Sequence, residues 1–208
     1  MNRFKLAIIG AGGHGRVVAD AALAGSWQNV VFFDDRYPEV AVTGDWAVEG
    51  TGRDLLQRLT DFDGVCIAIG HNTARLTLGI ELKRRGAPLT TIIHPHACVS
   101  PRASLASGCM VSAGAVINVG ANIGAASIIN TNASVDHDCH IGEGVHIAPG
   151  ANLSGDVTVG SRSWIGVGAT VRQGITIGSD VVIGAGAVVV SDMGDGVTAV
   201  GCPAKPRN

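Results

Sequence analysis

The stretch VDHDCHIGEGVH, residues 135–146, gathers three histidines and three acidic residues into twelve positions. Such a density is unusual in a chain in which only 15% of the residues are charged. An imidazole beside a carboxylate can act as a general base near neutral pH, because the acid fixes the ring and stabilises its protonated form. Clustered histidines and acids can also bind a metal ion, or form an ordinary solvated corner. Which of the three applies depends on the elements that carry these side chains.

A second group of polar candidates lies in the turn GAGGHG, residues 10–15, and at the end of the strand that follows it. The GxGxxG spacing lets backbone N–H groups at a helix start approach phosphate oxygens, and an acid about 20 residues further on would meet a ribose or base edge. The spacing alone is a weak signal, but the predicted strand before it and helix after it favour a bound nucleotide. The candidates are Gly10, Gly12, Gly13, His14, Asp34 and Asp35.

The second half of the chain has a period of six residues. A branched aliphatic residue occupies every sixth position from Val99 to Val189 without interruption, and a mostly small residue, such as Ala115 or Cys139, follows each after four positions. This pattern predicts a parallel β-helix, in which short strands wrap a narrow triangular core and three hexads complete one coil. Sixteen hexads give about five coils, a prism roughly 25 Å tall at strand spacing.

The first part of the chain follows a different pattern. Strands are predicted at 5–10, 30–35, 64–70 and 89–93, alternating with helices at 16–25, 52–59 and 74–86. This order is typical of a small Rossmann-like parallel α/β sheet. Two prolines in HPHACVSP mark the change of pattern, so we expect an α/β domain over residues 1–93 and an all-β domain over residues 94–208. A nicotinamide enzyme would need a second nucleotide-binding half, so a mononucleotide carrying another group fits better.

Composition excludes several function classes. The net charge of −2, the lack of a basic run and an aromatic content of 4% argue against nucleic-acid binding. No apolar run approaches the roughly 20 residues of a membrane-spanning helix, and no signal-peptide pattern is present, so a cytoplasmic protein is expected. Five cysteines without a CxxC pair argue against disulfides and a zinc knuckle.

The position of each histidine within its hexad predicts which way its side chain points. His137 lies two positions after inward Val135 and His146 one before inward Ile147, so both point out of the prism. His140 has the phase of His146 but lies on another face, where a plain surface position is expected. No two histidines of the hexad region are 18 residues apart, which argues against zinc within one chain. A metal shared between subunits is left open, although no metal is expected.

Taken with the hexads, GAGGHG, INTNASVDHDCHIGEGVHIAPGANLSG and the ending GCPAK resemble the bacterial nucleotide-sugar N-acetyltransferases of the left-handed β-helix superfamily, the group that includes sialic acid O-acetyltransferase-like proteins. The resemblance covers nearly the whole chain. It implies the left hand of the coil, a homotrimer, and transfer of acetyl from acetyl-coenzyme A to the 4-amino group of a UDP- or GDP-linked dideoxysugar, with UDP favoured.

The resemblance also implies residue roles. His137 matches the general base, with Asp136 or Asp138 as the orienting acid, Asn130 as a nearby polar support and His146 close to the reacting groups. Relatives often carry Glu where this chain has Asp138, and the sequence leaves open whether the shorter side chain reaches His137. The other implied positions are His14 beside the phosphates, the Gly155 N–H facing the thioester carbonyl, and Val167, Ala185, Pro203, Ala204 and Lys205 along coenzyme A.

Three further residues follow the predicted strand at 64–70. Gly70, His71 and Asn72 could contact the nucleotide, or His71 and Asn72 could merely cap a helix. No serine or cysteine has a matching catalytic partner, so direct transfer is expected without an acyl-enzyme. The alternatives are O-acetylation of a sialic-type sugar, acylation of a smaller amine, and a nucleotide-binding scaffold without catalysis.

Overall fold

The computed structural model describes residues 4–207, and the alternating elements of the first part fold as a three-stranded parallel sheet. β1 (Lys5–Ile9) lies between β2 (Asn29–Phe33) and β5 (Gly64–Ile67). All three strands are buried on both faces, as expected for a parallel sheet covered by helices. The predicted Rossmann-like sheet is therefore present.

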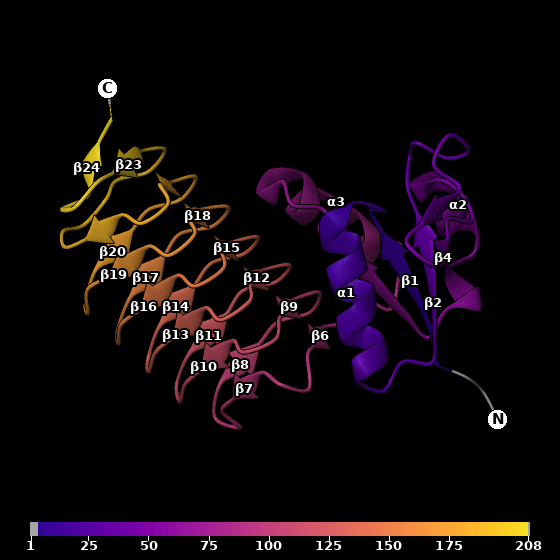
Figure 1. The fold of residues 1–208 in the computed structure, drawn as a ribbon, viewed down its shortest axis with the longest axis horizontal. Helices are drawn as coiled ribbons and strands as arrows, with labels where there is room; N and C mark the ends of the chain where they lie inside the picture. The colour runs from indigo at the N-terminus through magenta and orange to yellow at the C-terminus, as the bar shows by residue number, and fades with distance from the viewer. Residues whose placement is uncertain (1–3, 208) are drawn as a thin grey trace.

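Three helices cover this sheet (Figure 1). α1 (Gly13–Ala24) packs Val18 and Ala22 on one face, and α2 (Gly52–Gln57) and α3 (Asn72–Arg84) cover the other through Leu55 and Leu82. A side chain at Gly15 would collide with the Gly10 carbonyl, so this glycine allows close packing of α1 on the sheet. A hairpin of β3 (Val42–Thr43) and β4 (Trp46–Ala47) and a 3₁₀ turn at Leu59–Asp61 complete the domain.

The hexads form a triangular prism with three sheets of parallel strands, one of which is extended by an antiparallel strand at the end of the chain (Figure 1). We call them the docked, middle and open faces. The docked face contains β6 (Ile92–Ile93), β9 (Met110–Val111), β12 (Ile128–Ile129), β15 (His146–Ile147), β18 (Trp164–Ile165), β21 (Val182–Ile183), β23 (Thr198–Val200) and β24 (Lys205–Pro206). The middle face contains β7 (Cys98–Val99), β10 (Val116–Ile117), β13 (Ser134–Val135), β16 (Asn152–Leu153), β19 (Thr170–Val171) and β22 (Val188–Val189). The open face contains β8 (Ser104–Leu105), β11 (Asn122–Ile123), β14 (His140–Ile141), β17 (Thr158–Val159) and β20 (Thr176–Ile177).

The six-residue period is confirmed strand by strand. Each strand from β7 to β22 has two residues, and the second is the predicted aliphatic, which points into the core. Strands 18 residues apart pair in register, for example Val135 with Leu153. Cys139 is fully buried in the small column, as expected for a corner filler. With β6 and β23 extending the docked face, the solenoid has about six turns, one more than the hexads alone predict.

The α/β domain rests on the docked face. α1 lies beside β6 (Figure 1). Val18 of α1 shares one apolar cluster with Ile92, Met110 and Ile128. The predicted strand at 89–93 is shorter than expected: only Ile92–Ile93 forms β6, and it pairs with β9 of the prism. The domain boundary after residue 93 stays a prediction, and this pairing favours a position just before β6.

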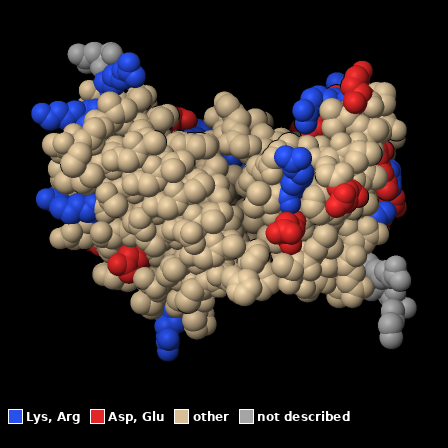
Figure 2. Space-filling model, viewed as in Figure 1, with Lys and Arg blue, Asp and Glu red and all other residues tan. Residues whose placement is uncertain are grey.

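Charged side chains are sparse on the prism. On the face seen in Figure 2, Lys and Arg mix with Asp and Glu over the α/β domain, whereas most of the prism surface is uncharged. This face offers no continuous basic stripe for nucleic acid. Among residues 4–207, no helix has the length and apolar character to cross a membrane. All five cysteines are free: Cys66, Cys109 and Cys139 are buried, and Cys98 and Cys202 are exposed.

Candidate active site

The three corners of the prism divide the predicted site residues into groups. Asn130, Val167 and Ala185 lie in turns that lead from the docked to the middle face. Asp136, His137, Asp138 and Gly155 lie in turns that lead from the middle to the open face. We call these the docked–middle and the middle–open corner, and the third, from the open back to the docked face, the open–docked corner. Within one chain the middle face therefore separates His137 from Asn130.

His137 stands exposed on the middle–open corner and is oriented by Asp138. Its Nδ1 lies 2.9 Å from Asp138 Oδ2, so the shorter acid does reach the ring. Asp136 instead accepts from the backbone N–H of His137 and from Asn118 Nδ2, both at 2.8 Å. The hydrogen bond to Asp138 raises the pKa of His137, and the carboxylates of Asp136 and Asp156 add to this effect. A carboxylate only accepts, so Nδ1 carries the proton and Nε2 is left free to accept one.

Gly155 lies directly under this ring. A Cβ at Gly155 would collide with Nε2 and Cε1 of His137, so only glycine allows the ring its position. Within residues 4–207, the Gly155 N–H donates to no acceptor. The corner thus presents a free imidazole nitrogen beside a free backbone donor.

A second imidazole group lies at the junction of the two domains. His146 points out of the prism as predicted, but the α/β domain covers it, leaving only 5% exposed. Its ring centroid lies 4.1 Å from that of Trp164 and 6.4 Å from that of His14 on α1. Burial, helped by the positive charge of Arg75, lowers the pKa of His14 to about 4 and of His146 to about 3, so both rings are neutral at physiological pH.

Asn130 defines the protonation of His146. Its Nδ2 lies 3.0 Å from His146 Nε2, and its Oδ1 accepts from the Thr131 N–H at 2.8 Å. Because an amide nitrogen only donates, Nε2 accepts and the His146 proton sits on Nδ1. Within one chain Asn130 therefore supports His146, not His137 as expected. His146 Nδ1 and His14 Nε2 are buried without a partner among the described residues, which fits a site that a ligand completes.

The glycine turn opens onto a cavity of about 1020 Å³. Gly10, with a φ of +106°, lines it together with Asp34, Asp35, Thr51 and Ile69. The two acids differ. Asp34 accepts from the Ala11 N–H and from Arg36, which lowers its pKa, so this carboxylate organises the turn. Asp35 accepts only from the Gly52 N–H among the described residues, so one oxygen stays available to a ligand.

Residues 70–72 have different structural surroundings. His71 Nδ1 accepts from the Ala74 N–H and caps α3, one of the two roles that the sequence left open. Asn72 is buried and donates to the carbonyls of Arg162 and Ser163 in the prism. Gly70 lies on an exposed bend beside the cavity wall at Ile69.

The predicted coenzyme residues lie at the docked–middle corner and at the end of the prism. Val167 is 53% exposed, and Ala185, Pro203 and Lys205 are also exposed. Ala204 differs, because its side chain closes the end of the core and its N–H donates to the Val188 carbonyl. Only the backbone of Ala204 could therefore contact a coenzyme.

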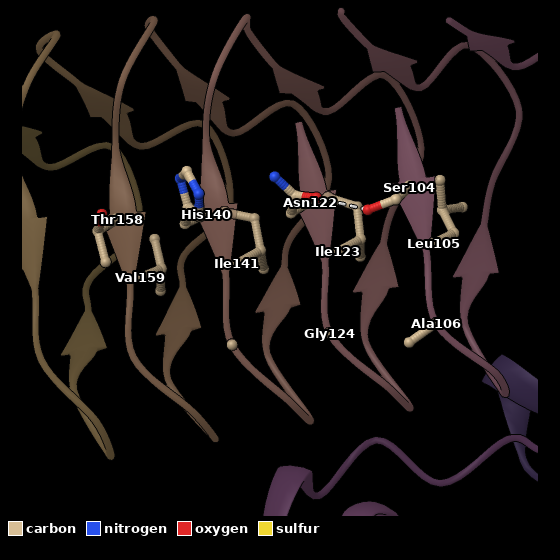
Figure 3. A pocket seen from close by; sticks show the side chains of 11 residues that line it. Ser104, Leu105, Ala106, Asn122, Ile123, Gly124, His140, Ile141, Thr158 and Val159 are labelled. Atoms are coloured by element: carbon tan, nitrogen blue, oxygen red, sulfur yellow. Dashed lines mark hydrogen bonds between the residues drawn. The ribbon is translucent and has the colours of Figure 1, made fainter. Parts of the chain in front are cut away.

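The open face carries a polar row rather than a reactive group. Ser104, Asn122, His140 and Thr158 point outward above a depression of about 500 Å³ (Figure 3). Ser104 Oγ donates to Asn122 Oδ1 at 2.6 Å, and His140 Nδ1 lies 3.1 Å from the Asp138 carbonyl. His140 is exposed, in agreement with its predicted surface position. In the part of the chain that the structure describes, no three His, Cys, Asp or Glu side chains are placed to share a metal ion.

Sequence reasoning missed two residues of the junction. Trp164 is the outward residue of β18 and packs on His146, a contact that follows from the spacing of 18. Arg75 is 1% exposed, although arginine is rarely buried. Arg75 lies on the same face of α3 as the buried Gly79 and Leu82, and this spacing was the signal in the sequence that Arg75 is buried.

Comparison with known proteins gives the same division into two parts. Residues 5–80 match the family described as PglD N-terminal domain, and residues 156–191 match the bacterial transferase hexapeptide repeats. The acetyltransferase domain of PglB from Neisseria gonorrhoeae is 45% identical, with a TM-score of 0.93 over 99% of this chain and 100% of that chain. A structure of the same domain in complex with acetyl coenzyme A is 43% identical, with a TM-score of 0.92 over 99% and 100%.

Two further relatives point to particular nucleotide sugars, one by its bound ligand and one by its name. PerB from Caulobacter crescentus, solved with CoA and GDP-perosamine, is 41% identical, with a TM-score of 0.91 over 98% of this chain and 97% of that chain. UDP-N-acetylbacillosamine N-acetyltransferase of Bacillus subtilis is 37% identical over 112 residues, which cover 52% of this chain and 51% of that protein. The chain thus matches about half the length of this curated relative.

An α/β domain with a glycine turn, joined to a hexapeptide prism, defines a left-handed β-helix acyltransferase with an additional N-terminal α/β domain. The full-length similarity narrows this class further. The chain belongs to the PglD-type nucleotide-sugar N-acetyltransferases.

Proposed function

We propose that this protein transfers acetyl from acetyl-coenzyme A to the 4-amino group of a nucleotide-linked 4-amino-4,6-dideoxy sugar. The observation that carries the proposal is the His137–Asp138–Gly155 corner in a chain that matches acetyl-CoA- and GDP-perosamine-bound structures over nearly its full length. UDP is the predicted nucleotide, supported by the Bacillus subtilis relative, and GDP is the alternative, supported by the Caulobacter one.

The proposed chemistry is direct attack. The sugar amine nitrogen bonds to the thioester carbonyl carbon, the carbon–sulfur bond breaks, and coenzyme A leaves as the thiol or thiolate. His137 Nε2 takes the proton that the amine must lose, and Asp138 stabilises the resulting imidazolium. The Gly155 N–H stabilises the negative charge on the thioester oxygen, a contribution of about 3 kcal/mol for a donor of this kind.

The α/β domain holds the nucleotide. The diphosphate lies at the start of α1, where Gly12 and Gly13 leave the backbone N–H groups accessible and no side chain caps the helix. Asp35 faces the base or ribose in the large cavity. His14 Nε2 and His146 Nδ1, both without partners among the described residues, contact the diphosphate and the sugar respectively.

We further propose that the site is completed between chains of a homotrimer. His137 and Gly155 lie on one corner of the prism, whereas His146, Val167 and Ala185 lie on or beside another. A neighbouring copy brings the two corners together, with the coenzyme between adjacent prisms. Exposed valines on both corners, Val119 at 48% and Val167 at 53%, support this packing because a neighbour would cover them.

The test is release of free coenzyme A with UDP- and GDP-linked 4-amino sugars. Wild type is expected to turn over the UDP sugar, and His137→Ala to lose about 100-fold in kcat. His140→Ala, an outward histidine on the open face, is the matched control and should keep normal turnover. Near-normal turnover of His137→Ala would remove His137 as the base. No thiol release by wild type with any sugar would favour the scaffold alternative, and release only with a hydroxyl acceptor would favour O-acetylation.

A further inference from the structure

Arg75 is a buried cation that the proposed chemistry does not use. It lies in the first turn of α3 and is 1% exposed. Among residues 4–207 it forms no ion pair, because no acidic side chain lies within salt-bridge distance. Burying an unpaired guanidinium is costly unless hydrogen bonds satisfy its N–H groups. Its hydrogen bonds therefore show what the side chain stabilises.

The guanidinium joins the nucleotide domain to the prism. Nη1 donates to the carbonyls of Ile69 and Gly70, at 2.9 and 3.1 Å, on the loop that follows β5. Nε donates to the Ala126 carbonyl at 2.7 Å, and Nη2 to the Gly144 carbonyl at 2.9 Å, both in the prism. One side chain thus fixes the wall of the nucleotide cavity at Ile69 to two successive coils.

Asn72 extends the same contact to a third coil. Its Oδ1 accepts from Arg75 Nη2 at 2.8 Å, and its Nδ2 donates to the Arg162 carbonyl at 2.9 Å. Ala126, Gly144 and Arg162 are 18 residues apart and occupy equivalent turns of the open–docked corner, with φ of 55°, 64° and 63°. Arg75 and Asn72 therefore bind a repeating row of carbonyls that only an intact solenoid presents.

The position of this contact relates it to catalysis. Ile69 borders the nucleotide cavity, and Arg75 is close enough to His14 and His146 for its charge to lower the pKa of both. The guanidinium of Arg75 thus lies next to the region in which the nucleotide, the sugar and the prism are proposed to meet. A shift of about 1 Å between reacting groups can cost about 100-fold in rate.

We propose that Arg75 is a positioning residue for acyl transfer, which fixes the nucleotide-binding loop at Ile69–Gly70 to the open–docked corner of the prism. The role rests on the proposed acetyl transfer. Arg75 touches neither substrate; it sets where the sugar amine lies relative to the acyl donor. Its effect must therefore appear in kcat more than in the binding of acetyl-coenzyme A.

The test compares Arg75→Lys and Arg75→Met with Leu76→Ala. Leu76 is the matched control, because its buried side chain packs on Gly144 of the same corner without taking part in the Arg75 hydrogen bonds. Both Arg75 variants should lose at least about tenfold in kcat while the KM for acetyl-CoA changes by less than about twofold. Leu76→Ala should lower Tm and keep kcat within about twofold of wild type.

Two kinetic outcomes would overturn the proposal. If Leu76→Ala loses as much kcat as Arg75→Met at an equal loss of Tm, ordinary packing explains the effect. If Arg75→Lys keeps the kcat of wild type, the positive charge is sufficient and the hydrogen bonds of the planar guanidinium are not required.

A calorimetric measurement does not depend on activity. Wild type should unfold in one transition, and Arg75→Met in two, because the α/β domain separates from the prism. A single transition in Arg75→Met would reject the role of Arg75 in fixing the two domains, whatever the activity. If wild type shows no acetyl transfer, the proposed function fails separately.

Discussion

At the scale of single residues, His137 has two neighbours of opposite kind. Asp138 holds Nδ1 through a hydrogen bond of 2.9 Å, and Gly155 leaves room for the ring by having no side chain. Asp138 itself adopts a left-handed conformation with φ of 58°, which aspartate tolerates better than most residues. Asp138 thus determines which ring nitrogen of His137 carries the proton, and Gly155 provides the space that the ring occupies.

Asp138→Asn should change the pH dependence of turnover. Asp138 is the main cause of the raised pKa of His137, so its loss lowers that pKa. A general base works when unprotonated, and the acid limb of kcat/KM should therefore move to lower pH while the maximal rate falls about tenfold or more. Asp136 accepts from the backbone N–H of His137 instead of from its ring, so Asp136→Asn should shift the acid limb of kcat/KM less. An unchanged limb in Asp138→Asn would show that another group titrates.

Gly155→Ala should impair catalysis without unfolding the protein. The new Cβ would collide with the His137 ring, so the ring must move and kcat should fall about 100-fold. Gly194→Ala is the control, because a Cβ there meets nothing within 4 Å. Both variants should keep a Tm close to that of wild type. Normal turnover in Gly155→Ala would mean that the observed ring position is not needed.

At the scale of elements, the hexad strands were predictable because the rule is local. One inward aliphatic residue in every six positions predicts both where a strand lies and which of its side chains face the core. Inward Val135 and Ile147 therefore place their neighbours His137 and His146 outside the core. What the hexads could not predict is which outward residues become buried. His146 is buried beside His14 of α1, which comes from a distant part of the sequence. The role of Arg75 depends on the same docking of the two domains.

The inward positions should dominate the stability of the prism. Ile165→Ala removes a fully buried side chain of β18 and should lower the free energy of unfolding by about 3 kcal/mol, which denaturant titration measures. Val182 on neighbouring β21 is 42% exposed, so Val182→Ala should cost less than about 1 kcal/mol. Equal losses in the two variants would contradict the assigned inward and outward phases.

At the scale of the whole molecule, two neutral imidazoles lie where the domains meet. The pKa values of His14 and His146 are lowered to about 4 and about 3, against 6.5 in the unfolded chain. Below pH 6.5 the unfolded state therefore binds protons that the folded state excludes, and stability is lost as the pH falls. Above pH 6.5 neither histidine contributes a pH dependence.

Lowering the pH from 6.5 to 4 should therefore lower Tm steeply. Each imidazole contributes on the order of 1 kcal/mol per pH unit in this window. His146→Gln should reduce the slope, whereas His140→Ala, which removes an exposed ring, should leave it unchanged. Tm measured between pH 4 and 8 checks this, and an equal slope in wild type and His146→Gln would contradict the burial of a neutral ring.

The arrangement of chains decides whether His137 and His146 can serve one reaction, and mixed oligomers test this most directly. His137→Ala and His146→Ala are each predicted to be nearly inactive. Coexpressed and purified through two different tags as mixed copies of the proposed trimer, they should recover about a third of wild-type turnover, because one site in three receives both intact residues from adjacent copies. Mixed trimers that stay as inactive as either parent would show that His137 and His146 do not meet between chains.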